Sequence, residues 1–192
     1  MDLDIRPLTA GLVDDFLAFF DHDAFADNPD WAGCYCMFFF CGAGVAEWDR
    51  TTREGNRARA IERIASGEMR GHLAYADGRV VGWCNTTPAA GLPGLPVFLG
   101  VTPESGVGSV SCFVVAKPFR RQGVARALLE AAVAGFRDEG LAAVEAYPRQ
   151  QTEDEAHGYP GPLALYEQAG FRVVGETSAV VSRLKVRLDL SP

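Results

Sequence analysis

The stretch that decides the fold is Ser111–Ala125, which reads SCFVVAKPFRRQGVA. Its beginning belongs to an apolar, β-branched run, Val110–Ala116, which predicts a buried strand. Its end opens a helical pattern of about Val124–Glu139, in which apolar side chains recur every three or four residues. The loop between them therefore joins a buried strand to the N-terminus of a long helix.

This loop contains the residues that favour binding of an anion. Backbone N–H groups at a helix N-terminus are unpaired and lie at the positive end of the helix dipole, so they bind phosphate. Gly123 lets a phosphate approach the backbone, Ala125 keeps the next turn small, and Arg120 and Arg121 add positive charge. The alternative is a solvated basic cap on an ordinary helix, and the sequence contains neither the Walker nor the dinucleotide-binding glycine pattern. The pattern predicts an anion site of the size of a diphosphate.

Strands and helices alternate on both sides of this segment. Asp77-Gly78 is a favoured two-residue turn, so the apolar runs that flank it predict a hairpin. The Gly- and Pro-rich stretch Pro88–Gly108 predicts an irregular loop. The order β-α-α-β-β-β-α-β-α-β-β predicts an α/β (α+β) fold, a mixed sheet covered by helices, with a parallel strand–helix–strand unit over Val110–Tyr147. The predicted helices are one after Thr9, then Thr52–Ser66, Val124–Glu139 and Pro162–Ala169, and the predicted strands are Leu3–Leu8, His72–Ala76, Arg79–Asn85, Val110–Ala116, Ala142–Tyr147, Phe171–Gly175 and Val180–Leu188.

The strand and loop resemble the acetyl-CoA-binding motif of the GNAT superfamily of N-acetyltransferases. That motif is a strand followed by Arg or Gln, two variable residues, Gly, one variable residue, and Gly or Ala. In this sequence the fixed positions are Arg120, Gly123 and Ala125. A second segment, Leu165–Phe171 (LYEQAGF), is similar to the recurring C-terminal signature of the same family. The resemblance implies a single GNAT domain over residues 1–192, with a splayed pair of central strands.

The resemblance also implies a co-substrate and a reaction. The co-substrate is acetyl-CoA, and the reaction is direct attack by an amine, from a small molecule or a peptide, on the acetyl or similar short acyl group in a ternary complex. A non-catalytic acyl-CoA-binding or sensor module is the alternative that the same motifs allow. The implied contacts are with the pantetheine arm for Phe113, Val114 and Val115, and with the pyrophosphate for Arg120, Arg121, Gln122, Gly123, Val124 and Ala125.

Two residues are candidates for acid–base catalysis. Tyr166, within LYEQAGF, matches the tyrosine that many family members use as a general acid toward the CoA thiolate, and a phenol supplies that proton without carrying charge at neutral pH. The alternative for Tyr166 is packing in the core. Glu145 is a candidate general base, because alternation along its strand turns it away from Val144 and Ala146 and toward the slot between the splayed strands. A base that acts through water is the alternative, and weaker candidates are His72, Asp27, Asp30 and Cys112.

The acceptor pocket is expected in an aromatic segment near the N-terminus. Trp31, Tyr35 and Phe38, with Phe39, lie where the family's variable helices and loop build this pocket, and they suit an apolar or aromatic acceptor. Filling of the core by these aromatic side chains is an equal alternative. Many members carry an Asn that touches the cofactor shortly before the last helix, but Arg149–Pro162 contains none.

Composition limits the partners. The chain has 25 acidic and 18 basic residues, a net charge of −7, which argues against a nucleic-acid binder. No apolar run reaches the roughly 20 residues of a membrane helix, so no membrane partner is expected. Five cysteines without a visible secretion signal predict reduced thiols in the cytoplasm, and Cys34, Cys36 and Cys41 lack a strong zinc spacing, so we expect no metal. The expected assembly is a monomer or a homodimer.

Overall fold

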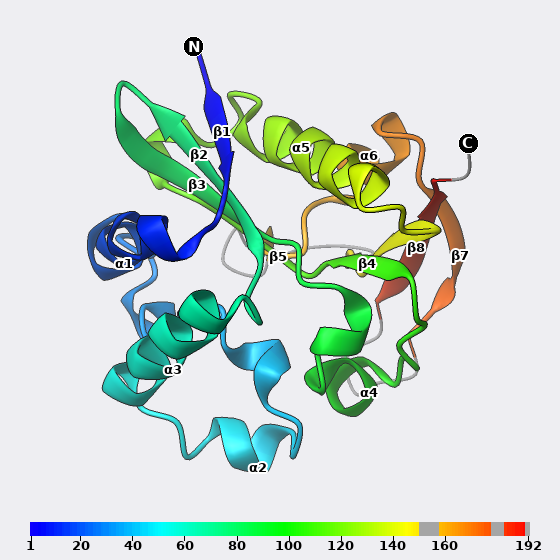
Figure 1. The fold of residues 1–192 in the computed structure, drawn as a ribbon, viewed down its shortest axis with the longest axis horizontal. Coiled ribbons are helices and arrows are strands. Elements are labelled where there is room, and N and C mark those ends of the chain that lie inside the picture. The colour runs from blue at the N-terminus through cyan, green and yellow to red at the C-terminus, as the bar shows by residue number, and fades with distance from the viewer. Residues whose placement is uncertain (150–157, 178–182, 191–192) are drawn as a thin grey trace.

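The structure, a computed structural model, describes residues 1–149, 158–177 and 183–190 as a mixed α/β fold (Figure 1). The predicted order of elements is confirmed, with two short helices added and the strand predicted at Val110–Ala116 divided in two. The helices are α1 (Val13–His22), α2 (Val45–Trp48), α3 (Arg53–Ser66), α4 (Gly94–Leu99), α5 (Val124–Asp138) and α6 (Leu163–Gln168). The strands are β1 (Asp4–Pro7), β2 (Gly71–Ala76), β3 (Arg79–Asn85), β4 (Val107–Val110), β5 (Cys112–Val115), β6 (Ala143–Ala146), β7 (Arg172–Glu176) and β8 (Leu184–Asp189).

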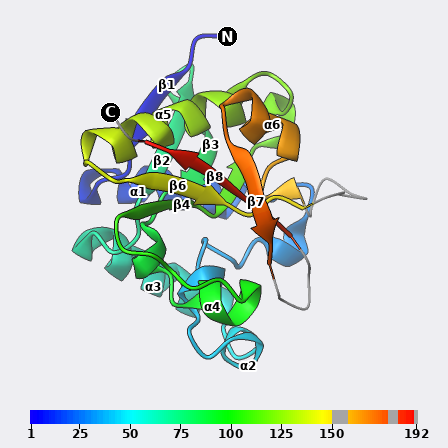
Figure 2. The same ribbon diagram turned by 90° about the vertical axis from the view of Figure 1, so that its right-hand side faces the viewer.

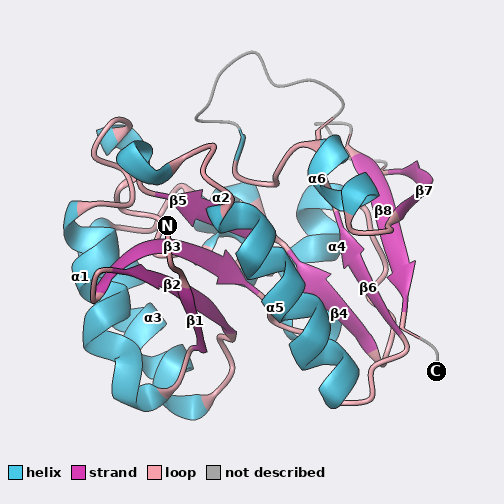
Figure 3. Ribbon diagram, turned by 90° about the horizontal axis from the view of Figure 1, so that it is seen from above, coloured by secondary structure: helices cyan, strands magenta, loops and turns pink. Residues whose placement is uncertain are grey.

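Two four-stranded sheets, β1-β2-β3-β5 and β4-β6-β8-β7, lie side by side (Figure 3). The chain passes from one to the other at Ser111, because β4 pairs in parallel with β6 whereas β5 pairs antiparallel with β3. Among the described strands, β5 and β6 form no ladder with each other. The central strands therefore splay apart beyond Ser111, as the resemblance implied.

Helices cover both faces of these sheets. Figures 1 and 2 show α5 and α6 on one face and α1, α3 and α4 on the other. Each face has its own apolar core: α5 buries Leu128 and Phe136 in one, and the other contains Phe16 and Phe20 of α1 with Trp83 of β3. Because α5 packs across β2 and β3, its N-terminus is fixed close to the end of β5.

Local sequence signals account for several of these elements. The hairpin between β2 and β3 turns at Asp77 and Gly78, whose φ angles of 50° and 77° match the twist of the flanking strands. The hydroxyl Oγ1 of Thr52 accepts the Gly55 N–H at 3.0 Å and caps α3, which ends at Gly67 with a φ of 76°. Both elements were predicted from the residues that form them.

The prediction of an irregular loop over Pro88–Gly108 is wrong in part, because this stretch contains α4 and the start of β4. Pro96 lies in the first turn of α4, where its missing N–H removes no helical hydrogen bond. The apolar residues around it, such as Leu95, are buried in the core. Proline and glycine therefore did not exclude a helix here.

Two predicted segments reach outside the described residues. Residues 150–157 of the stretch Arg149–Gly158 lie there, as do residues 180–182 of the predicted strand Val180–Leu188, whose described part is β8. In the parts of the chain that are described, no helix combines the length and the apolar character needed to cross a membrane.

Candidate active site

The N-terminus of α5 has the backbone geometry of an anion site. Gly123 precedes the first helical residue with a φ of 87°, and Arg121, two residues earlier, has a φ of 59°. No side chain of the described chain caps the helix there, so its first N–H groups are directed outward. A Cβ added to Gly123 would meet no atom within 4 Å, so glycine is favoured there by its backbone angle and the space in front of it is open. This arrangement suits a phosphate.

Arg120 does not point at this helix end. Its guanidinium binds the Asp27 carboxylate through two bonds of 2.7 and 3.0 Å, and its Nε donates to the Val115 carbonyl at 3.0 Å. The hydrogen bond from Arg120 lowers the pKa of Asp27. These contacts fasten the loop to β5 and to the segment before Trp31. The phosphate contact predicted for Arg120 stays a prediction, and the structure gives Arg120 an anchoring role that sequence reasoning missed.

The edge of β5 that faces the splay is covered by a short segment of the chain. The Phe113 N–H donates to the carbonyl of Tyr159 at 2.6 Å. The next residue, Pro160, accepts a hydrogen bond of 2.5 Å from the Tyr166 hydroxyl. The segment Tyr159–Pro160 therefore binds two of the groups predicted to contact the cofactor or its thiolate.

Tyr166 lies beside β5, as its predicted role requires. It is fully buried on α6, with its ring centroid 6.4 Å from that of Phe113 and 5.4 Å from that of Phe171. Burial raises the pKa of Tyr166 well above its ordinary value, so the phenol keeps its proton at neutral pH. Tyr166 thus both packs in the core and holds a proton next to the slot.

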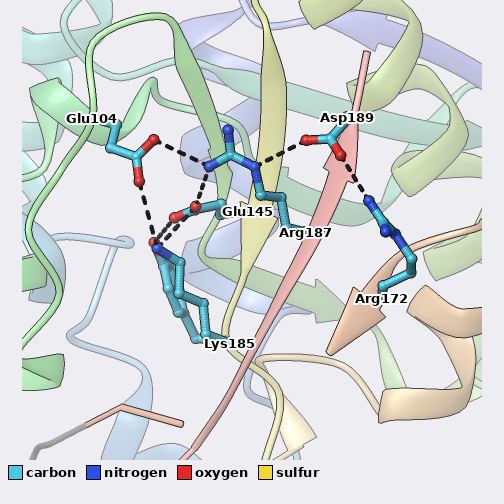
Figure 4. Close-up of polar contacts among 7 residues, drawn as sticks. Glu104, Glu145, Arg172, Lys185, Arg187 and Asp189 are labelled. Atoms are coloured by element: carbon cyan, nitrogen blue, oxygen red, sulfur yellow. Dashed lines mark hydrogen bonds and ion pairs between the residues drawn. The ribbon is translucent and has the colours of Figure 1, made fainter. Parts of the chain in front are cut away.

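Glu145 belongs to an ion-pair network (Figure 4). Its strand neighbours Val144 and Ala146 pack in the core beneath α5, so Glu145 faces the opposite side of the sheet. Its carboxylate lies 2.8 Å from Arg187 and 2.9 Å from Lys185, and the hydroxyl of Tyr147 donates to it at 3.2 Å. Glu104 contacts the same two cations. Only 2% of the Glu145 side chain is exposed, and Glu145 does not line the cavity described below. These contacts favour a structural role over the role of general base.

We expect Glu145→Gln to reduce stability without removing the chemistry. The substitution leaves Lys185 with Glu104, and Arg187 with Glu104 and Asp189, as the remaining carboxylates. Breaking a largely buried ion pair costs about 2–3 kcal/mol when the cations are still partly hydrated. Urea unfolding of the variant measures this loss. The rate of acyl transfer at a temperature where the variant is folded should stay within about threefold of wild type, and a loss of a hundredfold or more would restore Glu145 as the base.

A cavity of about 680 Å³ lies between the N-terminal segments and the start of β5. Trp31, Phe38 and Phe39, three of the aromatic residues predicted for the acceptor pocket, line it. That the acceptor binds in this cavity stays a prediction. Tyr35 does not: it is fully buried, stacks on Phe20 and donates from its hydroxyl to Asp21 at 2.5 Å. The other lining residues include Asp30, Arg53, Cys34, Cys36, Cys112, Arg149, Tyr159 and Arg183.

The weaker base candidates separate by position. Asp30 and Cys112 line the cavity, whereas Asp27 is bound to Arg120 and His72 lies at a different depression with Arg70. Cys36, which the sequence singled out only for its spacing with Cys34 and Cys41, also lines the cavity. It accepts from the Asn85 amide at 3.3 Å, and a hydrogen bond from Cys112 lowers the pKa of Cys36. All five cysteines are free thiols. Within the described ranges, no three His, Cys, Asp or Glu side chains gather as metal ligands would.

Comparison with known proteins agrees with this geometry. The model of the acetyltransferase (GNAT) family matches residues 25–171. The N-acetyltransferase from Staphylococcus aureus Mu50 has 15% identity, a TM-score of 0.59 and coverage of 100% of both chains. The PaiA N-acetyltransferase from Thermoplasma acidophilum, solved with coenzyme A, has 13% identity and a TM-score of 0.58, over 98% of this chain and 99% of that one. The ribosomal-protein-alanine N-acetyltransferase from Brucella melitensis has 19% identity and a TM-score of 0.57, over 97% and 99%.

No curated protein sequence matches the chain. At identities this low the solved structures establish the fold, while the family match covers well over half of the chain. The two motifs in the sequence, the splayed strands and the family match agree with one another, and the chain therefore belongs to the GNAT family of acetyltransferases and is an acyltransferase.

Proposed function

We propose that the protein is an N-acetyltransferase that moves the acetyl group of acetyl-CoA to an amine by direct attack in a ternary complex. The observation that carries this proposal is the N-terminus of α5, where Gly123 and Arg121 have left-handed backbone angles in front of open space. Its backbone N–H groups, from Arg121 to Ala125, would hold the pyrophosphate. We also propose that residues 1–192 form one domain.

The edge of β5 would hold the pantetheine arm. Phe113, Val114 and Val115 belong to β5, which splays away from β6. Backbone pairing at the free edge of a strand suits an extended amide chain. Since the Phe113 N–H now donates to Tyr159, the arm would replace that carbonyl as its partner. The proposal thus requires a local shift of Tyr159–Pro160 on binding.

In this proposal the acetyl group is transferred in the following steps. The acceptor amine loses a proton to water, and its nitrogen attacks the thioester carbonyl carbon. The C–N bond forms, the C–S bond breaks, and the sulfur leaves with the electron pair. Tyr166, beside Phe113, would give its proton to that thiolate. The proton that the nitrogen loses as the amide forms would restore the phenol through water. The acceptor would enter through the cavity lined by Trp31 and Phe38.

The acceptor is a small-molecule or peptide amine in this proposal. Solved structures of the same fold include an aminoglycoside 6'-acetyltransferase and a ribosomal-protein-alanine N-acetyltransferase, so the fold serves both kinds. We retain the cytoplasm as the proposed compartment, and a monomer or homodimer without nucleic-acid or membrane partners as the proposed assembly. The net charge of −7 and the five free thiols support this choice.

The test is an acceptor panel that follows release of the CoA thiol from acetyl-CoA. Primary amines of different classes are compared, with product mass confirming the acetylated nitrogen. Turnover on at least one amine, with acetyl-CoA binding at micromolar concentration, supports the proposal. Tight binding of acetyl-CoA without turnover on any amine would instead favour the acyl-CoA-binding module.

A further inference from the structure

The cavity is lined by a buried guanidinium that has no carboxylate partner among the described residues. Arg183, which precedes β8, is only 4% exposed. Its Nη2 donates to the hydroxyl of Tyr159, and its guanidinium lies over the same ring, 5.1 Å from the centroid. Its Nε and Nη1 are buried and find no acceptor in the part of the chain that the structure describes. Burying a charged group with N–H donors unsatisfied is costly, so the site is incomplete as it stands.

Arg149 adds a second cation beside it. The β6–β8 ladder pairs Ala146 with Val186, and the Leu184 N–H continues it by donating to the Pro148 carbonyl at 2.9 Å. The next pair in this register is Arg149 with Arg183. The Nε of Arg149 is likewise buried without an acceptor among the described residues. Two neighbouring guanidinium groups repel each other unless an anion lies between them.

The cations that follow Arg183 along β8 do have carboxylate partners. Lys185 and Arg187, two and four residues after Arg183, have Glu145 and Glu104 as partners, as Figure 4 shows. The fold therefore supplies carboxylates to one half of this row of cations. In the described structure it supplies none to the half that faces the cavity.

The rest of the cavity indicates what kind of anion fits. The third arginine of the described lining, Arg53, is paired with Asp21 at 3.9 Å. Among the described lining residues the only acidic one is the exposed Asp30. Aromatic side chains, including Trp31 and Phe38, form much of the remaining wall. The described part of the cavity wall is therefore net positive and partly aromatic, in a chain of net charge −7. Such a wall suits an apolar molecule that carries an anionic group.

We propose that Arg183 and Arg149, with the Tyr159 hydroxyl, bind a carboxylate, and that the protein acts on an amine whose apolar or aromatic body carries that group. The part of this inference that concerns the acceptor amine rests on the proposed function. The carboxylate has a second possible source, the distal end of a dicarboxylic acyl group on CoA. Guanidinium groups bind carboxylates through charge-assisted bonds in either case, so the experiment separates the two sources.

The test compares amines that differ only in a carboxylate, with acetyl-CoA as donor. Benzylamine is paired with 4-(aminomethyl)benzoate, phenethylamine with phenylalanine, and propylamine with 4-aminobutyrate. We expect at least one carboxylated member to exceed its partner in kcat/KM by tenfold or more, and Arg183→Met to abolish that preference. A second arm replaces acetyl-CoA by succinyl-CoA with the uncarboxylated amines. A preference for succinyl-CoA that depends on Arg183 would assign the carboxylate to the acyl group.

A binding measurement keeps this inference separate from the activity. Calorimetry with benzoate and 4-(aminomethyl)benzoate, in the presence of CoA, should give affinities that fall by about 10–100-fold in Arg183→Met. Arg53→Met is the matched control, because it removes a lining arginine whose charge is already paired. Arg149→Gln provides a second variant in case Arg183→Met does not fold.

The outcomes point in different directions. Binding of the carboxylates that depends on Arg183, without turnover on any amine, would sustain this inference and overturn the proposed function. Turnover on amines with no carboxylate preference, and with affinities unchanged by Arg183→Met and Arg149→Gln, would overturn this inference alone. An equal loss in Arg53→Met would also overturn it, because the effect would then be one of general charge.

Discussion

Tyr166→Phe is expected to slow the acetyl-transfer step by about 10²–10⁴, the usual contribution of a general acid. The substitution keeps the ring, which packs against Phe113 and Phe171, and removes only the hydroxyl. The affinity for acetyl-CoA should change little, while kcat and kcat/KM fall together, since the proton is needed mainly in the transition state. Because product release could limit turnover, the measurement is a pre-steady-state burst of CoA thiol.

Stability has to be measured beside the rate. The Tyr166 hydroxyl is buried and donates to the Pro160 carbonyl, so the Phe variant leaves that carbonyl without its donor, at a cost of about 1–3 kcal/mol in the free energy of unfolding. Tyr147→Phe is the matched control. Tyr147 is also buried, but its hydroxyl donates to Glu145, outside the slot. If both variants perform the chemical step within about threefold of wild type, Tyr166 is a packing residue and the thiolate is protonated by water.

The parts of the fold that sequence predicted are those fixed by nearby residues. α5 follows from apolar side chains at helical spacing, and the β2–β3 turn follows from Asp77-Gly78. The splay of the central strands was predicted only from the resemblance to the GNAT family. Composition could not locate it, because the apolar run Val110–Ala116 contains the end of β4 together with all of β5. Only the different partners of these strands, β6 and β3, divide the run at Ser111.

The site was predicted less completely, because its chemistry depends on pairings between distant segments. Arg149 and Arg183 become neighbours only through the register of β6 and β8. The same register brings two cations to Glu145, which its own strand pattern could not reveal. The sequence signal for this placement is the alternation of Glu145, Tyr147 and Arg149 along one face, which puts Arg149 on the same side as the predicted base.

The sequence also could not show which residues of the aromatic segment Trp31–Phe39 line the cavity. Trp31 and Phe38 line the cavity, whereas Tyr35, between them, is buried in the core. Tyr35 and Cys36 have φ angles of 42° and 58°, so the chain turns sharply at these positions. No period in the sequence marks such a turn, and the three aromatic residues therefore could not be separated from their spacing alone.

Gly123→Asp is expected to weaken CoA binding by about 10²–10³, because a carboxylate would stand where the pyrophosphate binds, and like charges brought together cost several kcal/mol. The substitution should not unfold the protein. Gly123 has a φ of 87°, and Asp is among the residues that enter left-handed conformations most readily. An added Cβ meets no atom within 4 Å, and a carboxylate at a helix N-terminus is itself favourable.

Gly123→Asn separates charge from shape. Asn has nearly the size of Asp and tolerates the same backbone angle, but it carries no charge. Calorimetry should therefore show a loss of about tenfold or less for Asn, and the larger loss for Asp should shrink as salt screens the repulsion. An Asp variant that is folded, by circular dichroism and urea unfolding, and that binds CoA within threefold of wild type would show that the pyrophosphate lies elsewhere. Equal losses for Asp and Asn would mean that bulk or backbone strain at Gly123, and not the repelled phosphate, weakens binding.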